Sequence, residues 1–288
     1  MTAPDARPMP AVPDSPPEDY RFKRTHQLRR APVEVWRARL VIRSLVEREL
    51  RALYKQAALG AAWAVLVPVT LMIVFTVFLQ RVANIDTGGV PYSLFSYIGL
   101  VPWSFFAGSV TAGGMSIVQQ MSLVNKIRCP REVFPLASVA VAAVNACIAT
   151  LVLVLLFAIN RFMPQPTTPL AIFPLVVLVL FTVAVTLYVS AFTVYVRDLR
   201  HALPILLQLG LFATPVVYGL DAIPESWRPW YCLVDPMAPV IDGLRQTVLY
   251  GNAPNWLYLG LGSLTTIVLL VTGVLVFRRL ETGFADVA

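Results

Sequence analysis

The sequence has 288 residues, of which 57% are apolar and 14% are charged, and its net charge is +7. A soluble globular domain has about 25% charged residues, so this composition excludes that class and predicts a membrane protein. The positive charge does not by itself indicate nucleic acid as a partner, because the basic residues are not gathered beside stackable aromatic side chains on a soluble surface.

Residues 1–32 are expected to form a disordered cytoplasmic tail. They contain seven prolines and an acidic pair at Glu18 and Asp19, and such a segment cannot bury enough apolar surface to fold. They also lack the apolar core of about 7–15 residues that a secretory signal peptide needs. The segment is therefore not predicted to be a signal peptide.

Residues 33–55 contain no proline and are rich in helix formers. Arg43, Glu47 and Arg51 follow one another at intervals of four residues, which places them along one helix face. This pattern favours an amphipathic helix in the inner headgroup layer over an ordinary solvated helix before the first span, because Trp36 and the arginine stems suit an interface. The apolar residues lie mostly on one side of this helix: Trp36, Leu40, Val46, Leu50 and Leu53.

Uncharged runs predict the transmembrane helices, because a bilayer core about 30 Å thick needs about 20 apolar helical residues. Six such runs follow residue 55, and they predict one transmembrane domain over residues 56–288. The fifth run is the shortest, and Pro204 and Pro215 interrupt it. The six runs cover residues 57–80, 95–119, 135–159, 170–195, 202–220 and 255–277.

The basic residues predict that both chain ends lie in the cytoplasm, because Lys and Arg near helix ends are retained on that side. With this orientation the outer segments contain only four of the 23 basic residues: Arg81, Arg161, Arg228 and Arg245. We therefore expect a multi-pass protein of the cytoplasmic membrane, and most of its net charge reflects its topology.

One predicted cytoplasmic loop differs from the rest of the chain in its charge. Lys126, Arg128, Arg131 and Glu132 lie within seven positions, whereas residues 87–125 and 133–160 carry no charge. Spacing alone is equally compatible with a docking segment for a partner and with a basic loop that only follows the charge rule for cytoplasmic loops.

Motifs for catalysis, ion coupling or metal binding are missing from the sequence. No phosphate-binding loop, HExxH or GxSxG motif occurs, so this chain is not expected to be an enzyme. No acidic residue falls in a predicted span, which argues against proton- or sodium-coupled transport. His26 and His201 have no second ligand at helical spacing, so no metal is expected. Cys232 alone of the three cysteines is predicted to face outside, which leaves no pair for a disulfide.

Four segments carry a family resemblance: LYKQAALGAAWAVLVPV at 53–69, SYIGLVPWSFFAGSVTAGGMSIVQQMSLVNKIRCPREVFPL at 96–136, VRDLRHALPILLQLGLFATPVVY at 196–218 and FRRLETGFADVA at 277–288. Together they resemble the membrane subunit of ABC-2-type polysaccharide exporters, which move O-antigen, teichoic acid or galactan chains. The resemblance covers nearly all of the chain after about residue 33. It implies an all-α membrane protein with six transmembrane helices, an N-terminal amphipathic interface helix, a cytoplasmic coupling helix and short extracytoplasmic re-entrant helices.

The resemblance also gives the charged loop a role. In this family the loop between the second and third spans forms a coupling helix that docks into a groove of a separate ATPase subunit. Basic side chains of the loop could pair with carboxylates of that partner, and its apolar side chains could anchor it. The implied coupling residues are Asn125, Lys126, Ile127, Arg128, Pro130, Arg131, Glu132 and Phe134.

The implied assembly is a homodimer with two copies of the ATPase, which bind the ATP and Mg²⁺, so no cofactor is expected in this chain. The substrate is expected to be a lipid-linked polysaccharide. In the second cytoplasmic loop, Arg197 and Asp198 are expected either to contact the ATPase or to cap the neighbouring helices. The nearest alternative function is an ABC-2 exporter of a drug or lipid. A passive channel and a membrane glycosyltransferase are more remote, and the latter would need more carboxylates near the inner face than Asp198.

Aromatic residues form a row on the fourth predicted span. Phe181, Tyr188, Phe192 and Tyr195 lie within about 60° of one helix face. This row favours helix packing and an interfacial aromatic belt, and the alternative is a surface on which sugar rings stack in a conduit. Tyr54 and Trp63 are candidates for the same lining.

The segment from Asp221 to Trp256 contains no run long enough to span the membrane, and the resemblance implies two short helices that dip back from the outer side. Within it, Asp242 and Arg245 are three residues apart and are expected to pair on a helix. Four aromatic residues would suit headgroup depth: Trp227, Trp230, Tyr231 and Trp256.

Overall fold

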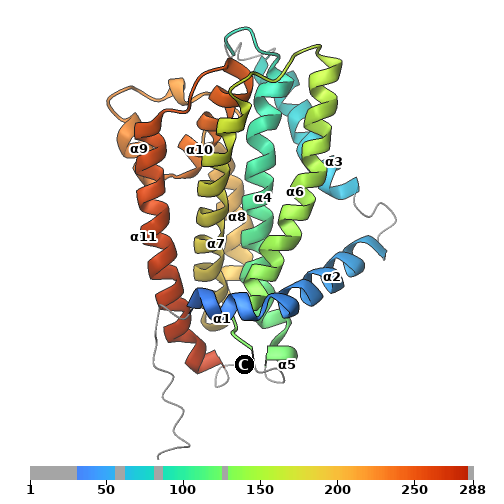
Figure 1. Ribbon diagram of the computed structural model, residues 1–288, viewed down its shortest axis with the longest axis vertical. Coiled ribbons are helices and arrows are strands. Elements are labelled where there is room, and N and C mark those ends of the chain that lie inside the picture. Colours follow the sequence, from blue (N-terminus) through green and yellow to red (C-terminus); the bar gives the residue numbers. More distant parts are fainter. Residues whose placement is uncertain (1–30, 56–61, 81–86, 125–128, 285–288) are drawn as a thin grey trace, which may run out of the picture.

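The computed structural model describes residues 31–55, 62–80, 87–124 and 129–284 (Figure 1). Within these ranges the chain is built from helices and contains no strand, which confirms the predicted all-α membrane fold. Most of the predicted tail lies outside the described residues. So do four of the implied coupling residues: Asn125, Lys126, Ile127 and Arg128.

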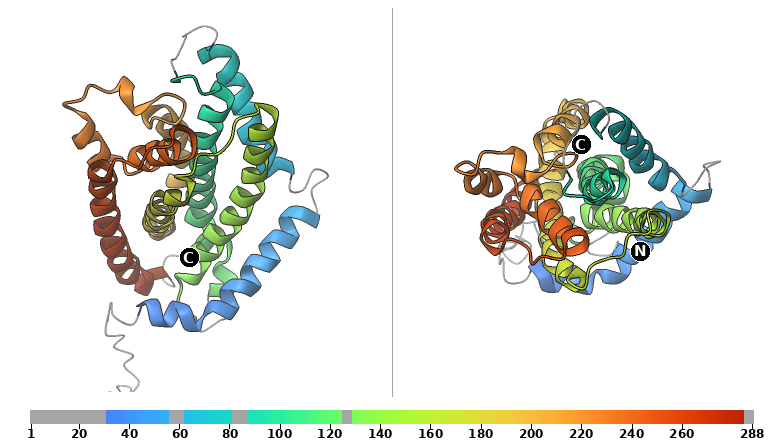
Figure 2. Two further views of the ribbon diagram at one scale, coloured as in Figure 1. Left: turned by 45° about the horizontal axis from the view of Figure 1, so that its top comes forward. Right: turned by 90° about the horizontal axis from the view of Figure 1, so that it is seen from above.

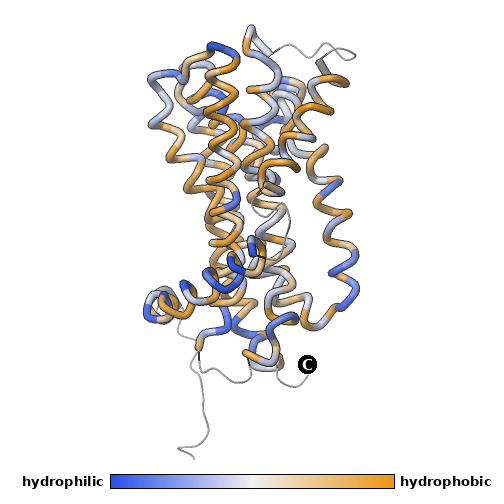
Figure 3. Tube along the Cα trace, turned by 90° about the vertical axis from the view of Figure 1, so that its right-hand side faces the viewer, coloured by the Kyte–Doolittle hydropathy of each residue, from blue (hydrophilic) through white to orange (hydrophobic). Residues whose placement is uncertain are grey.

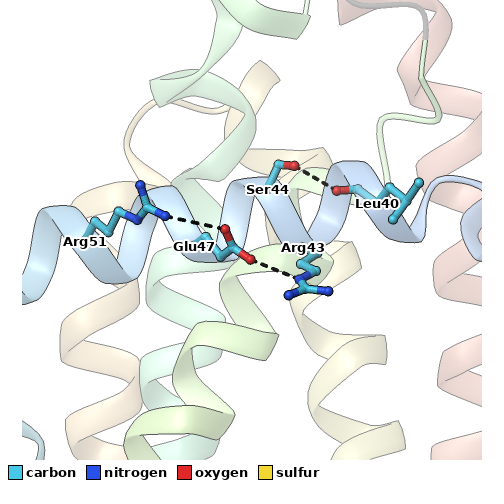
Figure 4. A network of polar contacts seen from close by, with 5 residues as sticks. All are labelled: Leu40, Arg43, Ser44, Glu47 and Arg51. Carbon is cyan, nitrogen blue, oxygen red and sulfur yellow. Dashed lines mark hydrogen bonds and ion pairs between the residues drawn. The ribbon is translucent and has the colours of Figure 1, made fainter.

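Two helices run across one end of the bundle, at the bottom of Figure 1. They are α1 (Ala31–Arg37) and α2 (Arg39–Lys55), and they bury Ala38 and Leu45 against the bundle. On the exposed face of α2, Glu47 accepts a hydrogen bond of 3.0 Å from Arg43 and forms an ion pair of 3.7 Å with Arg51 (Figure 4). Residues 33–55 are therefore helical, with a division into two helices at Ala38, and their place in the headgroup layer stays a prediction.

Four helices are long and apolar enough to cross a bilayer. They are α4 (Tyr92–Gln119), α6 (Val133–Ile159), α7 (Ile172–Tyr195) extended by the 3-10 turn η4 (Thr168–Ala171), and α11 (Trp256–Leu280). Two shorter apolar helices accompany them: α3 (Ala62–Phe75), continued by a π-helical turn η3 (Thr76–Gln80), and α8 (Leu199–Ala213). The four long helices correspond to four of the predicted spans, and the count of six stays a prediction.

Proline explains why α8 ends early. Its 15 residues rise about 22 Å, which is less than the bilayer core of about 30 Å. Thr214 is already extended, because Pro215 lacks an N–H group and disfavours the helical conformation in the residue before it. The fifth predicted span therefore continues beyond Ala213 as an irregular segment, which is buried from Thr214 to Val217.

Helix α4 is the centre of the bundle, and most of its residues are buried. The views in Figure 2 show it enclosed by neighbouring helices. On its α7 side, the rings of Phe106 and Phe181 stack with centroids 5.3 Å apart. By contrast, exposed apolar side chains lie along α6, α7, α8 and α11, and Figure 3 shows the hydrophilic residues gathered mostly at the two ends. An apolar outer surface of this kind suits a lipid environment.

Two short helices lie at the opposite end of the bundle from α1, as the resemblance implies (Figure 1). They are α9 (Arg228–Val234) and α10 (Met237–Arg245), and α10 continues into a π-helical turn η6 (Gln246–Tyr250). Gly251 ends this turn with φ +74°, a conformation that favours glycine. Of the tryptophans assigned to headgroup depth, Trp227, Trp230 and Trp256 are exposed.

Arg245 fixes α10 to the centre of the protein. Its side chain is only 2% exposed, and its guanidinium lies 3.7 Å from the ring centroid of Phe95. It was expected to pair with Asp242. In the structure its hydrogen bonds go to four backbone carbonyls instead: those of Phe95 (3.2 Å), Pro215 (2.9 Å), Val216 (2.5 Å) and Tyr218 (2.9 Å). Arg245 therefore satisfies carbonyls of the irregular segment after α8, whose backbone has no helical partners.

Candidate functional site

A buried ion-pair network lies at the end of the bundle that carries α1 and α2. Arg278, in the last turn of α11, donates from Nε to Glu132 Oε1 at 2.9 Å and from Nη2 to Glu34 Oε2 at 2.8 Å. Glu132 is 4% exposed and Arg278 is 8% exposed. Arg278 thereby joins α1, the end of the charged loop and the last long helix.

The C-terminal segment, residues 277–284, adds further contacts to this junction around Arg278. Arg131 donates to the backbone carbonyl of Glu281, which lies in the 3-10 turn η7 (Glu281–Gly283), and its guanidinium lies 5.6 Å from the ring centroid of Phe284. Phe284 is fully buried and packs edge-on against Phe277 at 5.8 Å. Tyr195, the last residue of α7, donates its hydroxyl to the carbonyl of Leu280 at 2.7 Å. The charged loop, α7 and the C-terminal segment are therefore mutually supported.

The described part of the charged loop, residues 129–132, is only partly accessible. Pro130 and Arg131 are half-buried, whereas Glu132 and Phe134 are buried within the chain itself. Phe134 was expected to anchor the loop to a partner, but in the structure it packs in the chain's own apolar cluster with Ile117 and Leu187. Burial and the nearby Glu132 carboxylate raise the pKa of the Cys129 thiol.

A second contact joins α2 to the end of α4. Gln120, which follows α4, donates from Nε2 to Glu49 at 2.9 Å and accepts a hydrogen bond from Arg48. Burial raises the pKa of the Glu49 carboxyl, although the Gln120 hydrogen bond and the Arg48 charge oppose this effect. Further along α2, Tyr54 donates its hydroxyl to Asn145 of α6 at 2.7 Å. Movement of α2 would therefore act on α4 and α6.

The predicted aromatic row divides into two parts. Phe181 is buried against Phe106, and Tyr188 donates its hydroxyl to Thr272 of α11 at 2.6 Å. These two contacts are the helix packing that the sequence favours. Phe192 and Tyr195 are 43% and 37% exposed.

The remaining conduit candidates lie on two other helices. Tyr54 makes its contact with α6, and Trp63 of α3 is exposed. The exposed members of the set, Phe192, Tyr195 and Trp63, can meet lipid, substrate or a second copy of the chain. The conduit role stays a prediction.

The turn between α7 and α8 contains the other two predicted coupling residues, Arg197 and Asp198, and both are exposed. Asp198 is the N-cap residue of α8, but its side chain makes no capping hydrogen bond. Its backbone carbonyl accepts from the N–H groups of His201 and Ala202. Side-chain capping, one of the two roles considered for Asp198, is therefore not formed.

The sequence reasoning missed the partners of the charged loop. Residues 277–288 carry part of the family resemblance, but no role was predicted for Arg278, Glu281 or Phe284. The available signal was the charged cluster FRRLE directly after the last apolar run.

Among the described residues, no group of three or more His, Cys, Asp or Glu side chains is arranged to hold a metal ion.

This arrangement of long apolar helices with a buried charged network at one end defines a polytopic membrane protein. The chain belongs to the ABC-2 type transporter family, whose profile matches residues 41–249. Members of this family are permease subunits and are not catalytic. The resemblance inferred from the sequence is thereby confirmed.

Three individual relatives show which members of this family the chain is similar to. The O-antigen export system permease protein RfbA of Myxococcus xanthus is 32% identical over 257 residues, which cover 88% of this chain and 97% of that protein. An RfbA of Klebsiella pneumoniae is 27% identical over 245 residues, covering 84% and 93%. The polysialic acid transport protein KpsM of Escherichia coli is 21% identical over 252 residues, covering 84% and 94%. The chain is thus similar, over nearly its whole length, to polysaccharide export permeases.

Proposed function

We propose that this chain is the membrane permease of an ABC transporter that exports a lipid-linked polysaccharide across the cytoplasmic membrane. The observation that carries this proposal is the similarity to O-antigen export permeases, which extends over almost the full length of those proteins. The working unit is a homodimer of this chain with two copies of an ATPase, and both chain ends lie in the cytoplasm.

The proposed orientation has support from the distribution of charge. The end of the bundle with α1 and α2 carries most of the basic residues in the described ranges, and Lys and Arg are retained on the cytoplasmic side. The opposite end carries Arg161, Arg228 and Arg245. At the first end lie Arg37, Arg39, Arg43, Arg48, Arg51, Lys55, Arg131, Arg197, Arg200, Arg278 and Arg279.

The network around Arg278 suggests how ATP hydrolysis would act on the helices. An ATPase that displaces the charged loop also pulls on Arg278 through Glu132 and on η7 through Arg131. Because α11 packs against α7 through Tyr188 and Thr272, the displacement reaches the long helices. In this proposal the charged loop, α1 and the C-terminal segment move together when the ATPase displaces the loop.

Export can be tested by depleting the chain in a cell that makes the polysaccharide. Lipid-linked polymer should accumulate inside while surface polymer falls, as measured by surface labelling against total polymer in lysed cells. The wild-type chain should restore export, and the ATPase alone should not. Normal surface polymer together with a failure to export a drug or a small lipid would contradict the proposal and favour the alternative exporter.

Orientation has its own test in a variant without native cysteines. A cysteine at Met163, which is exposed at the end opposite α1, should react with an impermeant thiol reagent in intact cells. A cysteine at the exposed Thr282 should react only after lysis. The reverse pattern would place both chain ends outside.

A further inference from the structure

A cleft of about 330 Å³ opens beside the turn that joins α7 to α8. Its apolar wall includes Met115 and Val118 of α4 and Met121 of α5 (Met121–Val124). Arg197 and Arg200 lie on its polar side. Helix α5 lies at the end of the bundle that carries α1 and α2 (Figure 1), so the cleft lies at that end.

The two arginines of the cleft have no described carboxylate to neutralise their charge. In the part of the chain that the structure describes, neither Arg197 nor Arg200 forms an ion pair with a carboxylate. Arg200 donates from Nε to Nε2 of His201 at 3.0 Å, which leaves its charge uncompensated. Asp198 is exposed and lies outside the cleft wall. Two guanidinium groups beside an apolar wall therefore favour an anion that carries an apolar part.

The first turn of α8 adds to this preference. The N-terminal end of a helix carries a partial positive charge and favours an anion. This turn contains no acidic residue and begins with Leu199, Arg200 and His201. The positive potential of the helix end thus adds to that of the two arginines.

We propose that the cleft binds the phosphate of an anionic phospholipid of the inner leaflet. Arg197 and Arg200 hold the phosphate, and Met115 and Val118 contact the first part of an acyl chain. Basic pockets between membrane helices on the cytoplasmic side are suited to anionic lipid headgroups. The inference rests on the orientation proposed above and does not depend on a glycan as the exported substrate.

A lipid in this position would join two segments next to the charged loop. Met121 precedes that loop, and Arg200 lies in the first turn of α8 on the other side of the cleft. The bound lipid would therefore hold the end of α4 and the start of α8 together.

The test uses the purified full-length chain in neutral detergent, titrated with phosphatidylglycerol or phosphatidylcholine. Native mass spectrometry measures the retained lipid, and thermal unfolding measures stabilisation. Phosphatidylglycerol should be retained and should raise the Tm, and phosphatidylcholine should do neither. Equal retention of the two lipids would overturn the proposal.

Two matched double variants separate the cleft from general surface charge. Arg197→Gln with Arg200→Gln should weaken phosphatidylglycerol retention about tenfold or more. Arg37→Gln with Arg279→Gln removes the same charge from exposed positions outside the cleft and should leave retention unchanged. Arg197→Lys with Arg200→Lys keeps the charge and should keep most of the binding, which shows that loss in the Gln variant is not misfolding. Equal losses in the two Gln variants would overturn the proposal.

Three further outcomes would also overturn it. Val118→Trp fills the apolar side of the cleft and keeps both arginines, so unchanged retention would mean that the lipid binds elsewhere. Competition by millimolar inorganic phosphate as effective as that by lipid would indicate a site for small anions. Normal retention by the Arg197→Gln, Arg200→Gln variant, with loss of the co-purifying ATPase, would indicate a protein contact. A reversed cysteine-labelling pattern would contradict the proposed orientation and therefore the assignment of the lipid to the inner leaflet. Lipid retention is measured on the purified chain and does not depend on that pattern.

Discussion

Arg278 at the end of α11 and Glu132 at the start of α6 form an ion pair of 2.9 Å in which both side chains are buried. Glu34 on α1 adds a second, more exposed carboxylate to the same guanidinium. Burial makes the pair sensitive to loss of one partner, because a single charge left inside the protein has no water to solvate it.

Arg278→Met should therefore reduce the free energy of unfolding by about 3–5 kcal/mol, because Glu132 then stays buried without its cation. Adding Glu132→Met should recover much of this loss, since the double variant buries no charge there. Thermal unfolding in detergent measures both. Glu47→Met, which removes the two exposed ion pairs with Arg43 and Arg51 on α2, should cost less than about 1 kcal/mol. A double variant as unstable as Arg278→Met would contradict the argument.

Arg131→Glu should uncouple ATP hydrolysis from export while the protein still inserts. The new carboxylate would face the carbonyl of Glu281 and lie beside Glu132, so the loop would lose its tie to the C-terminal segment. The measurement is the ratio of polymer exported to ATP hydrolysed in the complex with the ATPase. Phe284→Ala should act in the same direction, because Phe284 supports both Arg131 and Tyr195.

Arg279→Glu is the matched control for the loop, because Arg279 is exposed beside Arg278. It should leave the ratio of export to hydrolysis unchanged. An unchanged ratio in Arg131→Glu, measured on correctly inserted protein, would show that the loop is merely a topological signal.

The two parts of the aromatic row should respond differently to mutation. Tyr188→Phe loses only the hydrogen bond to Thr272 and should reduce stability by about 0.5–1.5 kcal/mol. Phe192→Ala removes an exposed ring and should reduce export with little change in Tm, if sugar rings stack there. Export assays on equal amounts of inserted protein separate the effects. Full export by Phe192→Ala would show that the aromatic row serves helix packing and is not a stacking surface for sugar rings.

Gly99→Ala should prevent stable folding. A Cβ atom at this position would lie 2.5 Å from the carbonyl oxygen of Val216 and 2.8 Å from Nη2 of Arg245, so the contacts that fix α10 would have to open. Gly108→Ala on the same helix is the control, because no atom lies within 4 Å of its added Cβ. It should be neutral or stabilising by up to about 1 kcal/mol. Similar yields and Tm values for the two variants would contradict this packing.

Hydropathy was enough to predict the four long helices, because an uncharged run makes up nearly all of each and can be recognised without knowledge of its packing partners. It was less accurate for α8, where Pro215 and the buried carbonyls after it replace the last turns of the expected span. There the final shape depends on Arg245, which lies about 30 residues later in the chain.

The partners of the charged loop could not be predicted from the sequence. Glu132 and Phe134 have the residue types of an interface, and their position in a charged loop suggested a partner chain. The structure buries both, because Arg278 and the C-terminal segment fold back onto the loop. Nothing in the local pattern states which of several arginines supplies the cation, since such pairing depends on how distant helices pack.

The separation of these partners along the chain has a consequence for biosynthesis. Glu34 and Glu132 precede Arg278 by 244 and 146 positions. While the ribosome is still making α11, both carboxylates lack the cation that later neutralises them. The ion-pair network around Arg278 can therefore close only after the last helix has been made, and a nascent chain truncated before Arg278 would expose an unfinished network to membrane proteases.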